Sequence, residues 1–398
     1  MTNLPNVFDS KQRRTLVLKR GKERVVANRH PWIFAGAIHT EKGPEDAAIG
    51  DLVDGEGTRI ASGFYSRHSQ IRLRALTFGD EELNADVIAA RLTRAIARRR
   101  PIFDEGTNCA RLVHADGDEL SGLVVDRYDD LLVVEIANRG VELIKPFVTQ
   151  TLLSAVTAQT GVSALRIHFK NDLPVREIER LLTDEEPVEP VRILESGLAF
   201  RVDAAKGQKT GFFLDQRENR RLAGTLASGR RVLNLFSYTG AFGVYAAVGG
   251  ATAVTNVDVS KDAIEVAREN HALNNSEAEL TVADAFQWVR QHREQYGLIV
   301  CDPPAFAKSR GEVDRAARGY KDINLHALRL VQPGGLMMTF SCSGHMSLDL
   351  FQKVIFAAAV DAGRRVSIVR RLTAGPDHPV SLYCPEGEYL KGFLLEVH

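Results

Sequence analysis

The sequence predicts an α/β protein in which a doubly wound, mostly parallel sheet follows a small β-barrel and an α+β region. Its 398 residues are too many for a single hydrophobic core, so two or three domains are expected. The first part of the chain has short segments of alternating polarity separated by glycines. The last part alternates strand-like and helix-like segments, the pattern of a parallel sheet covered by helices.

Residues 1–76 are predicted to form the barrel. The clearest segment is 70–76, where polar and apolar side chains alternate with the period of a strand. Further strands are expected at 15–19, 51–54 and 59–65. Short strands joined by glycine turns suit a small β-barrel.

Residues 77–187 are predicted to form an α+β domain. Its expected elements, in order, are a helix at 86–100 that ends at Pro101, strands near 123–125 and 131–136, a helix at 141–160, and a strand at 164–169. The acidic, proline-bounded stretch 183–190 is predicted to be a linker.

Residues 188–398 are predicted to form the doubly wound domain. Its strands are expected at 231–236, 253–258, 280–283, 298–302, 336–341, 365–369 and 390–396. Its helices are expected near 242–247, 261–274, 285–293, 315–331 and 348–362.

The composition predicts a cytoplasmic protein. No apolar run approaches the length of a membrane span, and the first ten residues lack the apolar region of a secretory signal. The cysteines are Cys109, Cys301, Cys342 and Cys384, and their spacing matches no zinc pattern. We therefore expect free thiols and no metal site.

Basic residues are unevenly distributed, although 51 Lys and Arg balance 51 Asp and Glu over the whole chain. The first 100 residues hold 18 basic against 12 acidic side chains. The excess is densest in a cluster of Lys11, Arg13, Arg14, Lys19, Arg20, Lys22, Arg24 and Arg29. Such a cluster can bind phosphates, and a solvated basic surface is the alternative.

A candidate ligand-binding loop follows the first strand of the third domain. Phe236, Ser237, Tyr238, Thr239 and Gly240 connect this strand to the next helix, and a glycine there lets the backbone approach a ligand closely. The G-x-G-x-x-G fingerprint of dinucleotide sites is absent, which disfavours a dehydrogenase.

Acidic residues end the next three strands. Asp258 can accept hydrogen bonds from ribose hydroxyls, Asp284 with Ala285 and Phe286 can contact an adenine, and Asp302 begins the sequence Asp-Pro-Pro. Each Asp could instead cap a helix. Together they predict a nucleoside site at the carboxyl edge of the sheet, with an adenosyl-methionine favoured over NAD.

These motifs resemble one family. The segments 234–240, 284–286, 302–307 and 341–344, with 209–217 upstream, are similar to class I methyltransferases of the RlmI type, which are bacterial large-subunit rRNA cytosine-C5 methyltransferases. The resemblance covers almost the whole chain. It implies a Rossmann-like methyltransferase domain at 188–398, a PUA-like RNA-binding barrel at 1–76, and the family's central α+β domain at 77–187.

The resemblance also implies the partners and the cofactor site. The cofactor is S-adenosyl-L-methionine, the substrate is rRNA of the large subunit or its assembly intermediate, and no membrane is involved; a homodimer is an open alternative to a monomer. The implied cofactor-binding residues are Phe213, Asp215, Phe236, Ser237, Tyr238, Thr239, Gly240, Asp258, Asp284, Ala285, Phe286, Asp302 and Pro303.

Cys342 and Asp302 are the candidate catalytic residues. Cytosine C5 is a poor nucleophile, and addition of a thiolate to C6 activates it. Cys342 follows the fifth strand and Asp302 the fourth, where the carboxylate could contact the base. Cys342 could also be a packed thiol. Asp-Pro-Pro occurs in methyltransferases of ring or exocyclic nitrogens too, so guanine N7 or another RNA nitrogen is the alternative target. A non-catalytic RNA-binding assembly factor is the alternative of another class.

Candidate substrate contacts are Lys11, Arg13, Arg14, Arg111, Pro304 and Phe306. Arg111 begins a polar stretch, 111–118, that is interpreted as a plain surface turn; its resemblance to the family's substrate-facing segment gives the alternative. Phe306 and Tyr320 could stack on a flipped base or could be packing residues.

Overall fold

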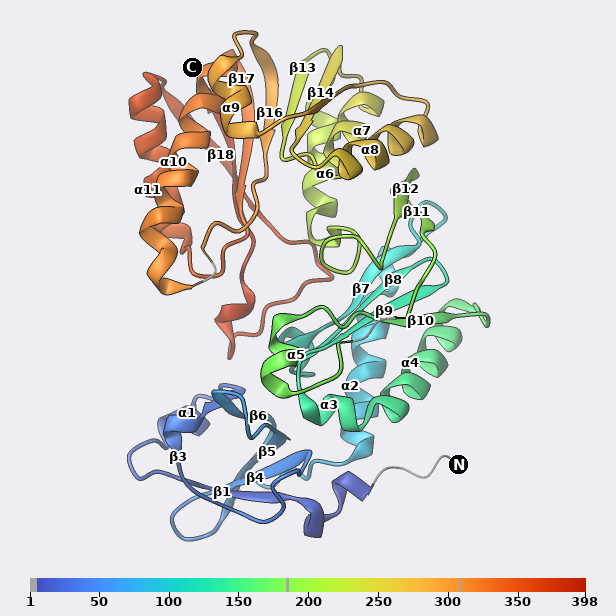
Figure 1. Cartoon of the computed structure of the whole chain (residues 1–398), viewed down its shortest axis with the longest axis vertical. Coiled ribbons are helices and arrows are strands. Elements are labelled where there is room, and N and C mark those ends of the chain that lie inside the picture. Colours follow the sequence, from blue (N-terminus) through green and yellow to red (C-terminus); the bar gives the residue numbers. More distant parts are fainter. Residues whose placement is uncertain (1–5, 184–185, 308) are drawn as a thin grey trace. The chain divides into compact units, whose positions relative to one another are not determined.

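A computed structural model describes residues 6–183, 186–307 and 309–398 (Figure 1). Asp184 and Glu185 of the predicted linker lie outside the described residues. The chain forms two compact units: the first holds residues 1–191, 202–212 and 377–387, and the second holds 192–201, 213–376 and 388–398. No helix in the described part of the chain is long and apolar enough to cross a membrane.

The first unit begins with a six-stranded sheet. Its order is β2-β6-β5-β4-β1-β3, with β1 and β4 parallel and the other pairs antiparallel. The elements are β1 (Arg14–Leu18), α1 (Arg24–Ala27), β2 (Trp32–Phe34), β3 (Ile38–Lys42), β4 (Ile49–Val53), β5 (Arg59–Tyr65) and β6 (Ile71–Phe78). The four strands expected from alternation are therefore present.

A four-stranded sheet of order β10-β9-β8-β7 follows in the same unit. Its elements are α2 (Ala85–Arg98), β7 (Cys109–His114), β8 (Leu123–Tyr128), β9 (Leu131–Ile136), α3 (Arg139–Leu143), α4 (Lys145–Thr160), β10 (Arg166–Phe169) and α5 (Pro174–Glu179). Two expectations were wrong here. The stretch 111–118, interpreted as a surface turn in the sequence, begins inside strand β7. The single helix predicted at 141–160 is two helices, because Pro146 stands in the first turn of α4, after a break at Ile144.

The two sheets of the first unit share a hydrophobic cluster, and the first sheet has a second cluster of its own. Ile49, Phe64 and Leu76 of the first sheet pack in the same cluster as Leu92 of α2 and Val134 of β9. Gly140 lies so close to the Phe64 ring that an added Cβ would be 2.3 Å from it. The core is thus continuous across the boundary predicted near residue 76.

The second unit contains a seven-stranded sheet of order β15-β14-β13-β16-β17-β19-β18. The first five of these strands are parallel, and β19 runs antiparallel between β17 and β18. The strands are β13 (Arg231–Leu235), β14 (Ala253–Asp258), β15 (Glu279–Val282), β16 (Tyr296–Cys301), β17 (Val331–Ser341), β18 (Val366–Thr373) and β19 (Lys391–Val397). A hairpin that the sequence did not predict, β11 (Val191–Glu195) and β12 (Leu198–Val202), precedes the sheet.

Helices cover both faces of this sheet (Figure 1). They are α6 (Arg217–Leu226), α7 (Ala241–Val248), α8 (Lys261–Leu273), α9 (Ala285–Gln291), α10 (Val313–Leu330) and α11 (Leu348–Ala362). Successive residues of a strand point to opposite faces of the sheet. On β16, Leu298 packs with α6 and α7, and its neighbour Ile299 packs with α9, α10 and α11. The predicted fold class, a Rossmann-like sheet with helices on both faces, is confirmed.

Candidate active site

The loop after β13 has an unusual backbone. Phe236, Tyr238 and Gly240 have positive φ angles of 57°, 47° and 76°. For the two aromatic residues this conformation is unfavourable, and such strain is typical of ligand-binding loops. At Gly240 an added Cβ would be 2.8 Å from the Cβ of Ala267, so only glycine fits against α8. The loop is therefore tightly constrained at the carboxyl end of the central strand.

Asp258, the last residue of β14, fixes this loop. Its carboxylate accepts hydrogen bonds from the backbone N–H of Tyr238 (2.7 Å) and of Ser260 (2.9 Å). Beside it, the hydroxyl of Ser237 is buried and has no partner among the described residues. A buried hydroxyl without a partner is costly, so it is suited to a ligand that offers a hydrogen-bonding group.

Asp284 caps helix α9, as the capping alternative proposed. Its carboxylate accepts from the N–H of Gln287 at 2.9 Å, and the residue is exposed. Ala285 next to it is buried, and the ring of Phe286 packs against Phe236 with centroids 5.9 Å apart. Capping uses one oxygen of the Asp284 carboxylate, so the second oxygen can still contact a ligand.

The segment before α6 contacts the β13 loop and the chain between β18 and β19. The ring of Phe213 packs edge-on against Tyr238 at 5.3 Å. Asp215 is buried, its carboxylate accepts from the hydroxyl of Tyr389 at 2.6 Å, and its backbone carbonyl accepts from the N–H of Gly375 at 3.0 Å. Asp215 is thus held by its own partners within the site.

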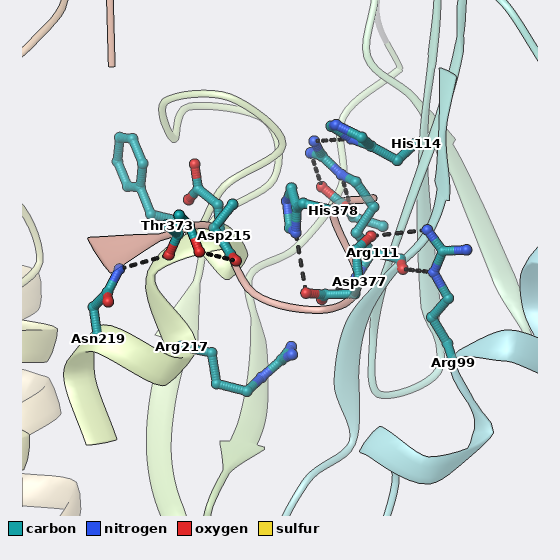
Figure 2. A network of polar contacts seen from close by, with 12 residues as sticks. Arg99, Arg111, His114, Asp215, Arg217, Asn219, Thr373, Asp377 and His378 are labelled. Atoms are coloured by element: carbon teal, nitrogen blue, oxygen red, sulfur yellow. Dashed lines mark hydrogen bonds and ion pairs between the residues drawn. The ribbon is translucent and has the colours of Figure 1, made fainter. Parts of the chain in front are cut away.

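Gln216 was missed in the sequence, although it lies inside the segment 209–217. Its amide N–H donates to Asp302 at 3.0 Å. Its amide oxygen accepts from Asn219 at 2.6 Å, and Asn219 also donates to the carbonyl of Thr373 at 3.1 Å (Figure 2). Because Asn219 fixes which end of the amide is the oxygen, Gln216 presents an N–H to Asp302 and orients that carboxylate.

Cys342 lies directly after β17, beside the Asp-Pro-Pro loop. Its Sγ is 3.8 Å from the carbonyl oxygen of Pro303. Pro303 is buried and Pro304 is exposed. Of the four cysteines, Cys342 is the one that is not buried. Cys301 is completely buried, and burial raises the pKa of its thiol well above the usual range. The two cysteines next to this loop therefore differ in accessibility.

Ser343 and Lys391, also missed in the sequence, hold the turn that carries Cys342. The Ser343 hydroxyl accepts from the N–H of Ala307 (3.2 Å) and shares a hydrogen bond with the Tyr320 hydroxyl (3.0 Å). Tyr320 is completely buried, so it is a packing residue and cannot stack on a base. Phe306 is partly exposed and packs on Tyr320 at 4.5 Å.

Two arginines of the basic cluster are not surface residues, which corrects the prediction for them. Arg13 is 7% exposed, and its guanidinium pairs with Asp51 and donates to the carbonyls of Phe8 and Leu83. Arg14 pairs with Glu41 through an 11% exposed side chain. The remaining members of the cluster are Lys11, Lys19, Arg20, Lys22, Arg24 and Arg29, which are exposed.

Arg111 is also buried, so the interpretation of its segment as a surface turn is wrong for this residue. Its guanidinium makes two 2.7 Å bonds to Asp126, and its backbone N–H donates to Asp377 at 3.1 Å (Figure 2). Strand β7 could have been recognised from the run Cys-Ala-Arg-Leu-Val-His. With both carboxylate oxygens of Asp126 bound to it, Arg111 is a structural residue of the first unit.

One group of described residues has the composition of a metal site. The ligand atoms of His30, Cys384 and Glu386 lie within 4.8 Å of one another. However, His30 Nδ1 accepts the N–H of Trp32 at 3.0 Å, which places the imidazole proton on Nε2, where it faces Glu386 at 3.2 Å. Neither nitrogen then offers a free lone pair, so the group is a hydrogen-bonded cluster.

Comparison with known proteins identifies the class. Residues 132–383 match a family described as S-adenosylmethionine-dependent methyltransferases, and residues 16–78 match a PUA-like domain. The chain is 42% identical over 396 residues to the ribosomal RNA large subunit methyltransferase I of Shewanella denitrificans, with 96% of this chain and 98% of the relative covered. It is 43% identical over 397 residues to that of Tolumonas auensis, with the same coverage. The chain belongs to this family of rRNA large subunit methyltransferases, which use S-adenosylmethionine.

Solved structures agree with the fold. A methyltransferase crystallised with S-adenosylhomocysteine superimposes with a TM-score of 0.79 at 23% identity, and a related S-adenosylmethionine-dependent methyltransferase from Streptococcus mutans with 0.78, also at 23% identity. Each comparison covers 96% of this chain and 99% of the other.

Proposed function

We propose that this rRNA methyltransferase forms 5-methylcytosine, with Cys342 as the nucleophile that adds to C6 of the base. The observation that carries the proposal is the placement of Cys342. It is the accessible cysteine, it follows a strand at the carboxyl edge of the parallel sheet, and its Sγ is 3.8 Å from Pro303 of the Asp-Pro-Pro loop. Ligands of open α/β sheets bind at this edge.

The chemistry requires the thiolate of Cys342. When its sulfur bonds to C6, the C5=C6 electron pair becomes available at C5 and forms the bond to the incoming methyl carbon, whose bond to the sulfonium sulfur breaks so that S-adenosylhomocysteine is left. A base then removes the C5 proton, the C6–S bond breaks as the C5=C6 bond re-forms, and the thiolate is regenerated. We assign to Asp302, which Gln216 orients, the role of the acid at N3: its carboxylic acid form donates the proton that N3 needs while negative charge develops on the ring.

The cofactor fits the residues around the β13 loop. S-adenosylmethionine supplies the methyl group. We assign the ribose hydroxyls to Asp258 and the adenine to Asp284, Ala285 and Phe286. The loop 236–240, with Phe213, Asp215, Asp302 and Pro303, completes the site. The buried Ser237 hydroxyl without a partner and the Gly240 position that admits no Cβ support this assignment.

The rRNA contacts are assigned to exposed groups. Lys11 and the exposed cations between Lys19 and Arg29 supply phosphate contacts from the PUA-like domain. Pro304 and Phe306, exposed and partly exposed beside Asp302, are assigned to the flipped base. Arg13, Arg14 and Arg111 are left out because their guanidinium groups are already paired.

Methylation of guanine N7 or another RNA nitrogen on the same fold is the alternative. The partly exposed Asp302, followed by a buried and an exposed proline, favours it, because a carboxylate and neighbouring carbonyls can bind an amine without any thiol. The two proposals differ in whether Cys342 is required. A purely non-catalytic assembly role is disfavoured by membership of a methyltransferase family.

An RNA substrate containing 5-fluorocytidine tests the proposal. Fluorine at C5 cannot leave as a proton does, so the methylated adduct should persist as a shifted, heat-stable band on a denaturing gel when S-adenosylmethionine is present. Cys342→Ala should abolish both band and methylation while retaining affinity for S-adenosylhomocysteine. Cys301→Ala, which alters the buried cysteine, is the matched control and should retain the band. Methylation by Cys342→Ala at the wild-type rate would favour a nitrogen target.

A further inference from the structure

Lys391 is a buried cation at the base of the Cys342 turn. It is the first residue of β19 and pairs with Ser341, the last residue of β17, in the antiparallel register. The residue is 6% exposed. Its Nζ donates to the carbonyl of Ser343 at 3.0 Å and to that of Met346 at 2.7 Å. Two of its three N–H groups thus bind the turn immediately after Cys342.

The charge of Lys391 has no carboxylate partner. Among the described residues, no Asp or Glu oxygen lies within the 4.0 Å of an ion pair, and its two hydrogen-bond acceptors are neutral carbonyls. Burial lowers the pKa of Lys391, while negative charge at Glu388 and at Cys342 raises it. A buried charge is normally paired, because removal from water is costly. On the turn that Lys391 binds, residues 342–346, the group able to carry a negative charge is the Cys342 thiol.

We propose that Lys391 stabilises the thiolate of Cys342 and so acts as the positioning and activating residue for the nucleophile. The proposal rests on the assignment of Cys342 as the nucleophile. It also explains how this turn could supply a reactive cysteine, since a nearby cation favours ionisation of a thiol.

Other titratable groups near the thiol do not supply a positive charge. Tyr320, from α10, reaches the same turn through Ser343; burial raises the pKa of its phenol, which therefore stays neutral. Asp302 begins the loop whose Pro303 carbonyl contacts Sγ, and a carboxylate opposes thiol ionisation. His345 is exposed on the turn itself. Lys391 is therefore the buried cation that can offset Asp302.

The rate of alkylation of Cys342 measures its ionisation without any RNA. The full-length protein is treated with iodoacetamide between about pH 5.5 and 9.5, and the modified Cys342 peptide is quantified by mass spectrometry. The thiolate is the reacting species, so the rate follows the ionised fraction. We expect Lys391→Met to move this profile to higher pH and to slow alkylation at pH 7 by about tenfold, the effect of one pKa unit. Lys353→Met, which changes an exposed lysine of α11, should leave the profile unchanged.

Lys391→Gln separates charge from hydrogen bonding, because it retains a donor for the turn and loses the charge. Slow alkylation in both variants, with wild-type affinity for S-adenosylhomocysteine, supports the proposal. Wild-type alkylation in Lys391→Gln overturns it, and so does an unchanged profile in Lys391→Met. A failure of the Cys342 adduct experiment would leave this profile unaffected, so the two proposals can fail separately.

Discussion

Two buried cations in this protein have different surroundings. In the first unit, Arg99 is 1% exposed and makes two 2.7 Å bonds to the two carboxylate oxygens of Asp118. It also donates to the carbonyls of Arg111 and Asp377. In the second unit, Lys391 is bonded to neutral carbonyls alone among the described residues.

The comparison distinguishes Arg99, whose charge is compensated by a carboxylate, from Lys391, whose charge is not compensated in this way. A guanidinium bound by both oxygens of a buried carboxylate has its charge compensated, and removing either partner leaves the other uncompensated. A buried ammonium that is bound by neutral carbonyls keeps an uncompensated positive charge. This charge can stabilise an anion that forms nearby. Three predictions test this contrast between the two units, from the largest expected effect to the smallest.

Breaking the compensated pair should cost the most stability. Arg99→Met leaves the Asp118 carboxylate, 1% exposed, without its buried bidentate partner and with the half-exposed Arg98 as its remaining ion-pair partner. We expect the free energy of unfolding to fall by about 3–5 kcal/mol in a urea titration. Arg94→Met is the control: its side chain is 54% exposed and pairs with Glu119, so the decrease should be below about 1 kcal/mol. Equal decreases in the two variants would remove the distinction between buried and exposed pairs.

Removing Asp258 should affect ligand binding more than folding. Asp258→Ala deprives a bound ribose of its acceptor and releases the N–H of Tyr238. A charge-assisted hydrogen bond is worth about 1.5–3 kcal/mol, so we expect affinity for S-adenosylhomocysteine to fall at least roughly tenfold in isothermal titration. Asp262→Ala alters an exposed acid on α8 and should bind as wild type does. If Asp258→Ala also binds normally, the ribose lies elsewhere.

The exposed cations of the first unit should give small, additive effects. Changing Lys19, Arg20, Lys22 and Arg24 to Gln should reduce the slope of log affinity for rRNA against log salt by about 0.7 for each single-strand phosphate that is no longer neutralised. Fluorescence anisotropy at several salt concentrations measures the slope. The control changes Lys353 and Arg268, exposed cations of the second unit, and should leave the slope unchanged. An unaltered slope in the first variant would make the cluster a solvated surface.

Deleting residues 1–76 is a poorer test, because Phe64 and Ile49 belong to a core shared with α2.

The sequence predicted the second unit better than the first for a physical reason. Asp258, Asp302 and Cys342 end or follow parallel strands, and such strands must bring their carboxyl ends to one edge. Their proximity therefore followed from element order alone. Helix α11 and strand β14 also have the predicted bounds; in the structure Ser347 caps α11, and β14 is largely buried.

Burial of charged side chains could not be predicted in this way. Arg13 looked like a surface group because its partner, Asp51, is distant in sequence. Arg111 looked like one because its partner, Asp126, lies on the other strand of a pair that was not recognised in the sequence. Lys391 carried a weak signal, as a charged residue at the start of a mostly apolar strand. Its role depends on the carbonyls of a turn 45 to 48 residues earlier, which only the tertiary structure brings together.

The segment 377–387 has a practical consequence for anyone who wishes to divide this protein. In the sequence it lies between β18 and β19, yet it belongs to the first unit. There Asp377 accepts hydrogen bonds from the backbone N–H of Arg111 and from the guanidinium of Arg99. A gene fragment that stops at residue 191 would lack these acceptors and would leave buried donors unsatisfied. An N-terminal fragment made for structural or screening work should therefore carry both 202–212 and 377–387, grafted through designed linkers, and expression of the simple fragment 1–191 should yield aggregated material.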